Sequence, residues 1–200
     1  MNCWQCKVEI NKGALFCDEC SRLQPPSPAL NHFERLGLKV QYDLTSQEVV
    51  SAHRTLQRKV HPDRFVSKSD RERRFSLEHA TALNDAVRTL KDPQKRATYL
   101  LSMRGFDIEA ENSTIKLNPM FLMEVMELRE AISELGGADN QTERAQIEHE
   151  VAARYEGTLS TVGLALDDDE STQSNEEIAH LVAELKYLKR MLDQIHGESE

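Results

Sequence analysis

The chain has 200 residues, of which 39% are hydrophobic and 6% aromatic, enough for one large or two small domains with modest cores. It contains no run of about 18 apolar residues, which excludes a membrane-spanning helix. The net charge of −9 divides unevenly, with +6 on residues 31–105 and −15 on residues 106–200, a pattern that favours a basic and an acidic module with different partners.

The first residues, MNCWQC, lack the basic and apolar regions of a signal peptide and the arginine-rich stretch of a transit peptide. We therefore expect a cytoplasmic bacterial protein with no membrane partner. The alternative is a protein of the mitochondrial matrix, seen in a processed or trimmed form.

All four cysteines fall within the first twenty residues, as two CxxC pairs: Cys3 with Cys6, and Cys17 with Cys20. Each pair places two thiolates on a tight turn, and the loop between the pairs lets them converge on one tetrahedral ion. Disulfides are disfavoured without a secretion signal, and no βαβ pattern supports a redox-active pair. We therefore predict a zinc-binding knuckle over residues 1–24, with one structural zinc ion that supplies most of its folding energy.

A proline-rich connector over residues 25–30 leads into two predicted helices. The first follows Thr45 and the second follows Ser69, and both starts have the form of a capping box, with a glutamate three residues on. Apolar stripes at helical spacing come after each cap, which predicts an antiparallel pair of helices. Two histidines on these stripes are interpreted as packing residues: His53 and His79.

The loop between these helices carries His61-Pro62-Asp63. Proline has no amide donor and biases the residue before it away from the α region, so His61 should leave the first helix. As an acid–base pair, His61 and Asp63 would need a pocket and a nucleophile, and as metal ligands they lack a third partner. A rigid turn that presents an imidazole and a carboxylate beside positive charge fits a recognition element better. The neighbouring cations are Arg54, Arg58 and Lys59.

Further helices are predicted after Asp92-Pro93, after the N-cap and first-turn proline of Asn118-Pro119, from about 140 to 166, and after Ser174. The last three, joined by short polar loops, imply a small antiparallel bundle. The acidic run 167–170 is expected to be a solvated loop. Strand signals are absent from the sequence, so the predicted fold class is all-α.

The run from Phe33 to Tyr99 resembles a J domain, with a basic helix, the His-Pro-Asp loop, a third helix that ends at Asp92-Pro93, and the pattern KRATY after it. Further motifs narrow the resemblance to the HscB family, J-protein co-chaperones of iron–sulfur cluster biogenesis. They are Leu56-Gln-Arg, Tyr99-Leu-Leu, Gly105-Phe106, Phe121-Leu-Met-Glu, Glu127-Leu-Arg-Glu and the N-terminal CWxC pair. No Gly/Phe-rich linker or CxxCxGxG repeat of the general-purpose J proteins occurs.

The resemblance covers nearly the whole chain and implies a domain order. A J domain would occupy residues 31–105, a linker residues 106–117, and a client-binding bundle of three helices residues 118–200. It also implies a function without catalysis, in which the J domain docks on a DnaK-type chaperone and stimulates the ATPase of that partner. The residues that would dock are His61, Pro62, Asp63, Arg54, Arg58 and Lys59.

The same resemblance implies that the bundle binds an iron–sulfur scaffold of IscU type. The residues at the matching positions are Leu122, Met123, Met126, Glu127, Glu130, Glu134 and Tyr187. Met126 stands where the family pattern has leucine, so the shape of this patch differs. Periodicity alone favours the alternative that Leu122, Met126 and Tyr187 are bundle core.

Two other functions stay open. The first is a J protein with a different client, and the second is a zinc-knuckle nucleic-acid binder with a basic helical domain. The charge of −15 on residues 106–200 opposes nucleic acid as a partner. A homodimer formed through the bundle is possible, but no pattern in the sequence supports it.

Overall fold

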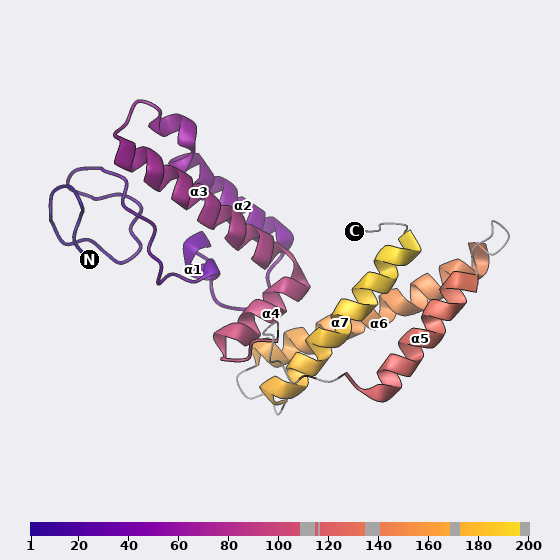
Figure 1. The fold of residues 1–200 in the computed structure, drawn as a ribbon. Coiled ribbons are helices and arrows are strands. Elements are labelled where there is room, and N and C mark those ends of the chain that lie inside the picture. The colour runs from indigo at the N-terminus through magenta and orange to yellow at the C-terminus, as the bar shows by residue number, and fades with distance from the viewer. Residues whose placement is uncertain (109–114, 116, 135–140, 169–172, 197–200) are drawn as a thin grey trace. The chain divides into compact units, whose positions relative to one another are not determined.

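The computed structural model describes residues 1–108, 115, 117–134, 141–168 and 173–196, and within them lie seven α-helices, one short 3₁₀ helix and no strand (Figure 1). The predicted all-α class is confirmed. The chain forms two compact units, Met1–Val40 with Leu44–Asp92, and Gln41–Asp43 with Pro93–Glu200. None of the described helices combines the length and apolar character needed to cross a membrane.

In the first unit, α2 (Ser46–Val60) and α3 (Asp70–Lys91) form the predicted pair, and α1 (His32–Leu36) packs against both. All three helices begin with a capping box, so the two boxes predicted from sequence are confirmed. In each, the N-cap side chain accepts from the amide of a glutamate that reaches back to the N-cap amide. The short 3₁₀ helix η1 (Pro62–Phe65) lies in the loop between α2 and α3.

The core of this unit lies along α3, whose predicted apolar stripe is largely buried: Phe75, His79, Leu83, Ala86 and Leu90. On α2, only Val49 and Val60 are fully buried, because α2 packs mainly against one neighbouring helix. His79 is buried, as interpreted, whereas His53 is only half-buried and contacts α3 through a polar atom. His53 Nε2 lies 3.0 Å from the side-chain oxygen of Asn84, and His79 Nε2 lies 2.9 Å from the carbonyl of Gln24.

The second unit contains α4 (Pro93–Met103), α5 (Pro119–Glu134), α6 (Gln141–Asp167) and α7 (Asn175–His196). The helix α7 is central, because α4, α5 and α6 all pack against it. Its buried residues recur every three or four positions: Ile178, Ala179, Val182, Leu185, Leu188, Met191, Leu192 and Ile195. The predicted three-helix bundle is thus joined by α4. The domain boundaries given above stay a prediction, since a family segment and a compact unit need not coincide.

A short loop, Gln41–Asp43, is fixed against the end of α6 in the second unit. The carboxylate of Asp167 accepts hydrogen bonds from the backbone amides of Tyr42 (2.5 Å) and Asp43 (2.7 Å). The guanidinium of Arg96 lies 4.9 Å from the centre of the Tyr42 ring. The expectation that the acidic run is only a solvated loop is therefore wrong for Asp167, which ends α6 and binds this loop. Residues 169–170 lie outside the described residues.

The Tyr42 ring packs closely against α6 at a position where only a glycine leaves room for it, Gly163. A Cβ added at Gly163 would lie 2.7 Å from Tyr42 Cε1, whereas a Cβ at Gly157, on the same helix, would meet nothing within 4 Å. We expect Gly163→Ala to lower the free energy of unfolding by about 1–3 kcal/mol through overpacking. Gly157→Ala should raise it by about 0.5–1 kcal/mol, because alanine favours the helix.

Urea denaturation followed by circular dichroism measures the free energy of unfolding of both variants and of the wild type. Equal stabilities for the two would mean that the ring of Tyr42 does not rest on Gly163 in solution.

Candidate functional site

The two CxxC pairs at the N-terminus sit on turns of the same construction. In the first, the Cys3 amide donates to the Val8 carbonyl (2.8 Å), and the Lys7 amide donates to the Cys3 carbonyl (3.1 Å). Cys17 and Ser21 take the equivalent places in the second turn. The residue after each pair has a positive φ, 66° at Lys7 and 54° at Ser21, which is the left-handed conformation that closes the turn.

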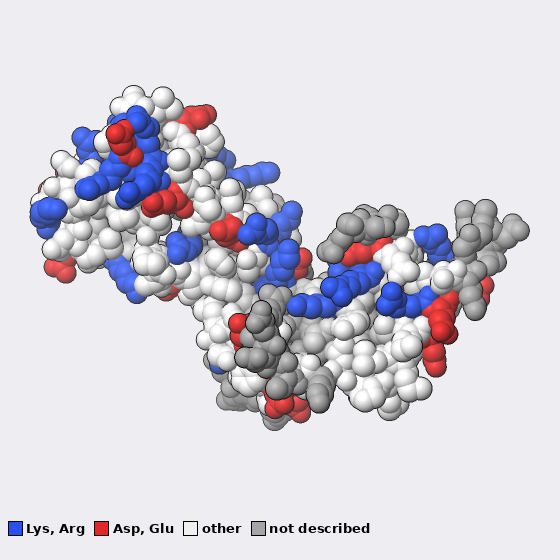
Figure 2. Space-filling model, viewed as in Figure 1, with Lys and Arg blue, Asp and Glu red and all other residues white. Residues whose placement is uncertain are grey.

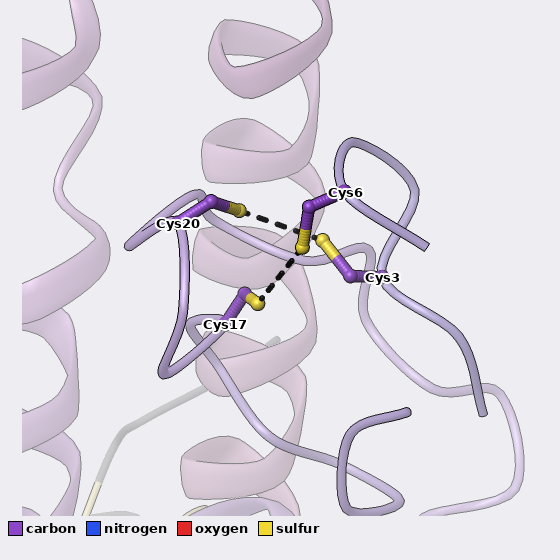
Figure 3. A group of neighbouring side chains, drawn as sticks. All are labelled: Cys3, Cys6, Cys17 and Cys20. Carbon is purple, nitrogen blue, oxygen red and sulfur yellow. Dashed lines mark hydrogen bonds between the residues drawn. The ribbon is translucent and has the colours of Figure 1, made fainter. Parts of the chain in front are cut away.

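The turns bring the four sulfur atoms together in one cluster (Figure 3). The Sγ atoms of Cys3 and Cys20 lie 3.6 Å apart, as do those of Cys6 and Cys17, and all four lie within 4.8 Å of one another. A disulfide bond would need about 2.05 Å, so the cysteines are free. Four sulfurs around a tetrahedral ion at about 2.3 Å would lie about 3.8 Å apart. The cluster is therefore positioned to bind a metal ion.

The acidity of these thiols supports the same conclusion. Burial opposes ionisation of Cys3, but backbone amides of Cys6 and Gln5 and the neighbouring thiols lower its pKa to about 6. For Cys6, the backbone amide of Val8 favours the thiolate, yet burial and the other three sulfurs raise the pKa to about 12. Packed thiols cannot all ionise near neutral pH unless a cation offsets their mutual repulsion.

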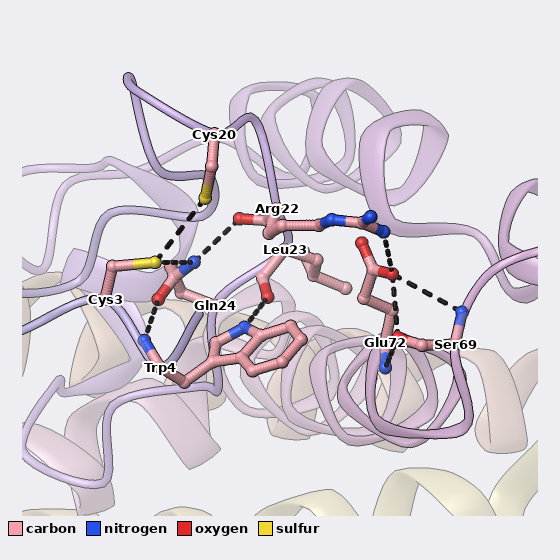
Figure 4. Close-up of polar contacts among 8 residues, drawn as sticks. All are labelled: Cys3, Trp4, Cys20, Arg22, Leu23, Gln24, Ser69 and Glu72. Atoms are coloured by element: carbon pink, nitrogen blue, oxygen red, sulfur yellow. Dashed lines mark hydrogen bonds and ion pairs between the residues drawn. The ribbon is translucent and has the colours of Figure 1, made fainter. Parts of the chain in front are cut away.

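The tetracysteine element, residues 1–24, is held on the face of α3 by Trp4 (Figure 4). The indole ring meets Phe75 edge to face at 6.1 Å between centres, and the guanidinium of Arg71 lies 5.0 Å from its centre. The indole N–H donates to the carbonyl of Leu23 at 2.7 Å, and the Leu23 side chain is fully buried. An aromatic residue between two cysteines thus joins the cluster to the helical domain.

Two polar side chains stabilise this arrangement, Gln24 within the element and Arg22 between the element and α3. The fully buried amide of Gln24 donates to Cys3 Sγ at 3.4 Å and to the Arg22 carbonyl at 2.8 Å, and its oxygen accepts from the Trp4 amide at 3.3 Å. Arg22 Nη1 donates to the carboxylate of Glu72 at 2.7 Å. Burial opposes the charge on Glu72, but Ser69 and Arg22 lower its pKa. Sequence reasoning found Glu72 as a cap, but missed Arg22 and Gln24.

Trp4 is the only tryptophan in the chain, so it reports on this attachment. We expect a strong chelator to shift its emission to longer wavelength, because loss of the metal ion would unfold the turns that hold the ring. Far-UV circular dichroism should change little, since the helices keep their own caps and core. A Cys17→Ser chain should show the shifted emission before chelation and no further response. Emission unaffected by either treatment would contradict a metal-dependent element.

The His-Pro-Asp turn has the geometry of an exposed recognition element. His61 has φ −57° and ψ 131°, so it leaves α2 as predicted and begins η1. Its Nδ1 accepts from the Asp63 amide at 3.3 Å and lies 3.6 Å from the Asp63 carboxylate. The Asp63 side chain is 87% exposed, so its charge is available to a partner. This exposure suits recognition and does not suit acid–base catalysis, which needs a group shielded from water.

A groove of about 450 Å³ runs from the exposed face of α2 to this turn, lined by His53, Arg54, Gln57, Arg58, His61 and Arg64. Three of the predicted docking residues line it, while Lys59 and Asp63 lie nearby in sequence and are exposed. Sequence reasoning missed Arg64, whose guanidinium donates to the Arg58 carbonyl at 3.0 Å. Figure 2 shows Lys and Arg side chains gathered around the end of the first unit, with a few carboxylates among them.

The predicted patch on the bundle is exposed. Met123 and Met126 are more than 60% exposed, and Leu122 and Tyr187 are 37% and 36% exposed, so the alternative that they form bundle core is wrong. Phe121 is buried and meets the Tyr187 ring edge to face at 6.3 Å, which places α7 beside this face of α5. Glu127 and Glu130 are exposed as well, and the side chain of Glu134 lies outside the described residues.

Met120, which sequence reasoning missed, adds a further apolar side chain near the start of α5 and is 69% exposed. The sequence signal that could have revealed Met120 is the uninterrupted apolar run at the start of this helix, Met120 to Met123. Four exposed apolar residues on one helix are uncommon on a solvated surface and indicate a binding face.

Comparisons with known proteins agree with this geometry. Residues 31–99 match the DnaJ domain, and residues 117–196 match the family described as the HSCB C-terminal oligomerisation domain. A co-chaperone protein HscB homolog of Burkholderia multivorans is 36% identical over 170 residues, which are 85% of this chain and 94% of the relative. The chain belongs to the HscB co-chaperone family.

Other HscB proteins extend the match. The HscB homolog of Vibrio vulnificus strain CMCP6 is 38% identical over 83% of this chain and 95% of its own length. The crystal structure of human co-chaperone protein HscB matches 99% of this chain and 98% of its own, with a TM-score of 0.87 and 29% identity. The structure of chaperone HscB from Vibrio cholerae matches 84% of this chain and 96% of its own, with a TM-score of 0.73 and 32% identity. The predicted family and its J domain are confirmed, and HscB is a co-chaperone family, not an enzyme family.

Proposed function

We propose that this HscB protein brings an iron–sulfur scaffold of IscU type to a DnaK-type chaperone and stimulates the ATPase of that chaperone, aiding iron–sulfur cluster assembly and transfer. The observation that carries the proposal is the exposed turn of His61 and Asp63, set beside a cationic groove on a J domain. The bacterial relatives favour a cytoplasmic location.

The docking turn would act through differential binding. Asp63 offers an exposed carboxylate to a cation of the partner, and Pro62 fixes the imidazole of His61 at a set distance from it. If these contacts form only with the chaperone conformation that hydrolyses ATP, they raise the population of that conformation. The rate gain then belongs to the partner. Arg54, Arg58 and Lys59 would steer association with an acidic face.

The scaffold would bind on α5 and α7. Leu122, Met123 and Met126 offer flexible apolar contact, and Tyr187 offers an aromatic edge. Glu127, Glu130 and Glu134 would meet lysine or arginine residues around the apolar site of the scaffold. An apolar centre with a charged rim is the usual composition of a protein interface.

The metal ion of the tetracysteine element is proposed to be one Zn²⁺. Four thiolates suit zinc, and a tetrahedral site with four protein ligands leaves no open position for chemistry. The ion would hold the two turns together and would take no part in a reaction.

Substitution of His61 tests the docking turn. In steady-state ATPase assays with a DnaK-type chaperone and scaffold, we expect the wild type to stimulate and His61→Gln to lose essentially all stimulation, because glutamine cannot reproduce the imidazole contacts. His149→Gln makes the same exchange at an exposed position of α6 and should stimulate like wild type. Stimulation that survives His61→Gln would rule out the turn as the docking element.

Truncation of the apolar patch tests scaffold binding. We expect Leu122→Ala with Met123→Ala to weaken scaffold affinity about tenfold or more, measured by isothermal titration calorimetry. Leu164→Ala removes a leucine of α6 that is 73% exposed, where no scaffold contact is proposed, and should bind like wild type. If the double variant bound the scaffold normally and still stimulated the chaperone, the protein would be a J protein with another client.

A further inference from the structure

A second hollow, of about 370 Å³, lies in the first unit between the tetracysteine element and the end of the α2–α3 pair. Phe16, Cys20, Ser21 and Arg22 line it from the element. Lys59, Arg64, Phe65, Lys68 and Glu72 line it from the helical domain. Four of its nine lining residues come from a segment that the J domain match does not include.

The charge of this hollow is positive. Its lining holds four cations and one carboxylate, and that carboxylate, on Glu72, is buried and already paired with Arg22. Within the part of the chain that the structure describes, Lys59, Arg64 and Lys68 form no ion pair with a carboxylate. Three cations gathered around one opening without internal counter-charges favour an anionic ligand.

The hollow also has an apolar part. Phe65, which is 5% exposed, and Phe16, which is half-buried, both line it. A bare phosphate or a metal complex would gain nothing from two phenyl rings. An acidic peptide segment that carries an apolar side chain would use both the cations and the rings.

The position of the hollow indicates which protein supplies that segment. Arg64 lines this hollow and also lines the groove beside His61, so the two openings share a wall. Lys59, one of the predicted docking residues, lines the hollow as well. The groove and the hollow therefore form one continuous surface, and a chaperone docked on the His-Pro-Asp turn would also contact the tetracysteine element.

We infer that the tetracysteine element supplies one wall of a second docking pocket, which binds an acidic segment of the DnaK-type chaperone with an apolar side chain seated against Phe16 and Phe65. The inference rests on the proposed function. It gives the metal-bound element a direct part in partner binding. The contacts of Trp4 with α3 and of Arg22 with Glu72 hold this wall in place before the partner arrives.

The test is a titration of the chaperone ATPase with the full-length, metal-loaded protein. Lys68 is exposed, and it is its backbone amide that donates to the Phe65 carbonyl, so Lys68→Glu should leave the fold intact. We expect it to raise the half-maximal concentration about fivefold and leave the maximal stimulation unchanged, since the His-Pro-Asp turn is untouched. Phe16→Ala, checked for metal content, should raise the half-maximal concentration as well. Lys12→Glu is the control, because Lys12 is exposed on the same element and does not line the hollow.

A rise for Lys68→Glu that clearly exceeds the rise for Lys12→Glu supports the inference. Equal half-maximal concentrations for these two variants, with normal maximal stimulation, would overturn the inference and leave the proposed function standing. Failure of the wild type to stimulate at all would overturn both. If Lys68→Glu instead weakened binding of a fluorescent oligonucleotide and left the ATPase titration unchanged, the pocket would take nucleic acid and the inference would be wrong.

Discussion

The buried carboxylate of Glu72 is the contact on which the first unit depends. A buried charge is costly unless it is paired and hydrogen-bonded, and Glu72 meets both conditions. It accepts from the Ser69 hydroxyl at 2.8 Å and from Arg22 at 2.7 Å. The first bond starts α3 directly after the His-Pro-Asp loop, and the second fixes the tetracysteine element. One carboxylate therefore sets the position of the loop and of the element together.

The two proposed binding surfaces differ in how they are built. The docking turn is held by local contacts, because Pro62 fixes the backbone and hydrogen bonds to neighbouring residues orient His61 and Arg64. The patch on α5 relies on flexible methionine side chains, which adapt to the shape of an apolar partner. A locally held, charged turn suits discrimination between conformations of one chaperone. A flexible apolar patch suits high-affinity binding of one client.

Local features of the fold could be predicted from the sequence, since they depend on neighbouring residues. The caps at Thr45 and Ser69, and the exit of His61 from α2, each follow from a few adjacent side chains. The cysteine cluster followed from the spacing of its pairs. The contacts of Trp4 with Phe75 and of Asp167 with Tyr42 could not be predicted, because they join residues far apart in sequence. Nor could periodicity tell that the patch on α5 faces water, since apolar residues occur on several sides of that helix.

The attachment of the tetracysteine element has a consequence for the order of synthesis. During synthesis the element leaves the ribosome before Glu72, the partner of Arg22, which lies 50 residues further along the chain. Trp4 and Leu23 have no helix to cover them during that interval. Until α3 emerges, the two turns of the element are held by contacts within the element itself: their backbone hydrogen bonds, the bond from Trp4 to the Leu23 carbonyl, and a metal ion where the four cysteines bind one.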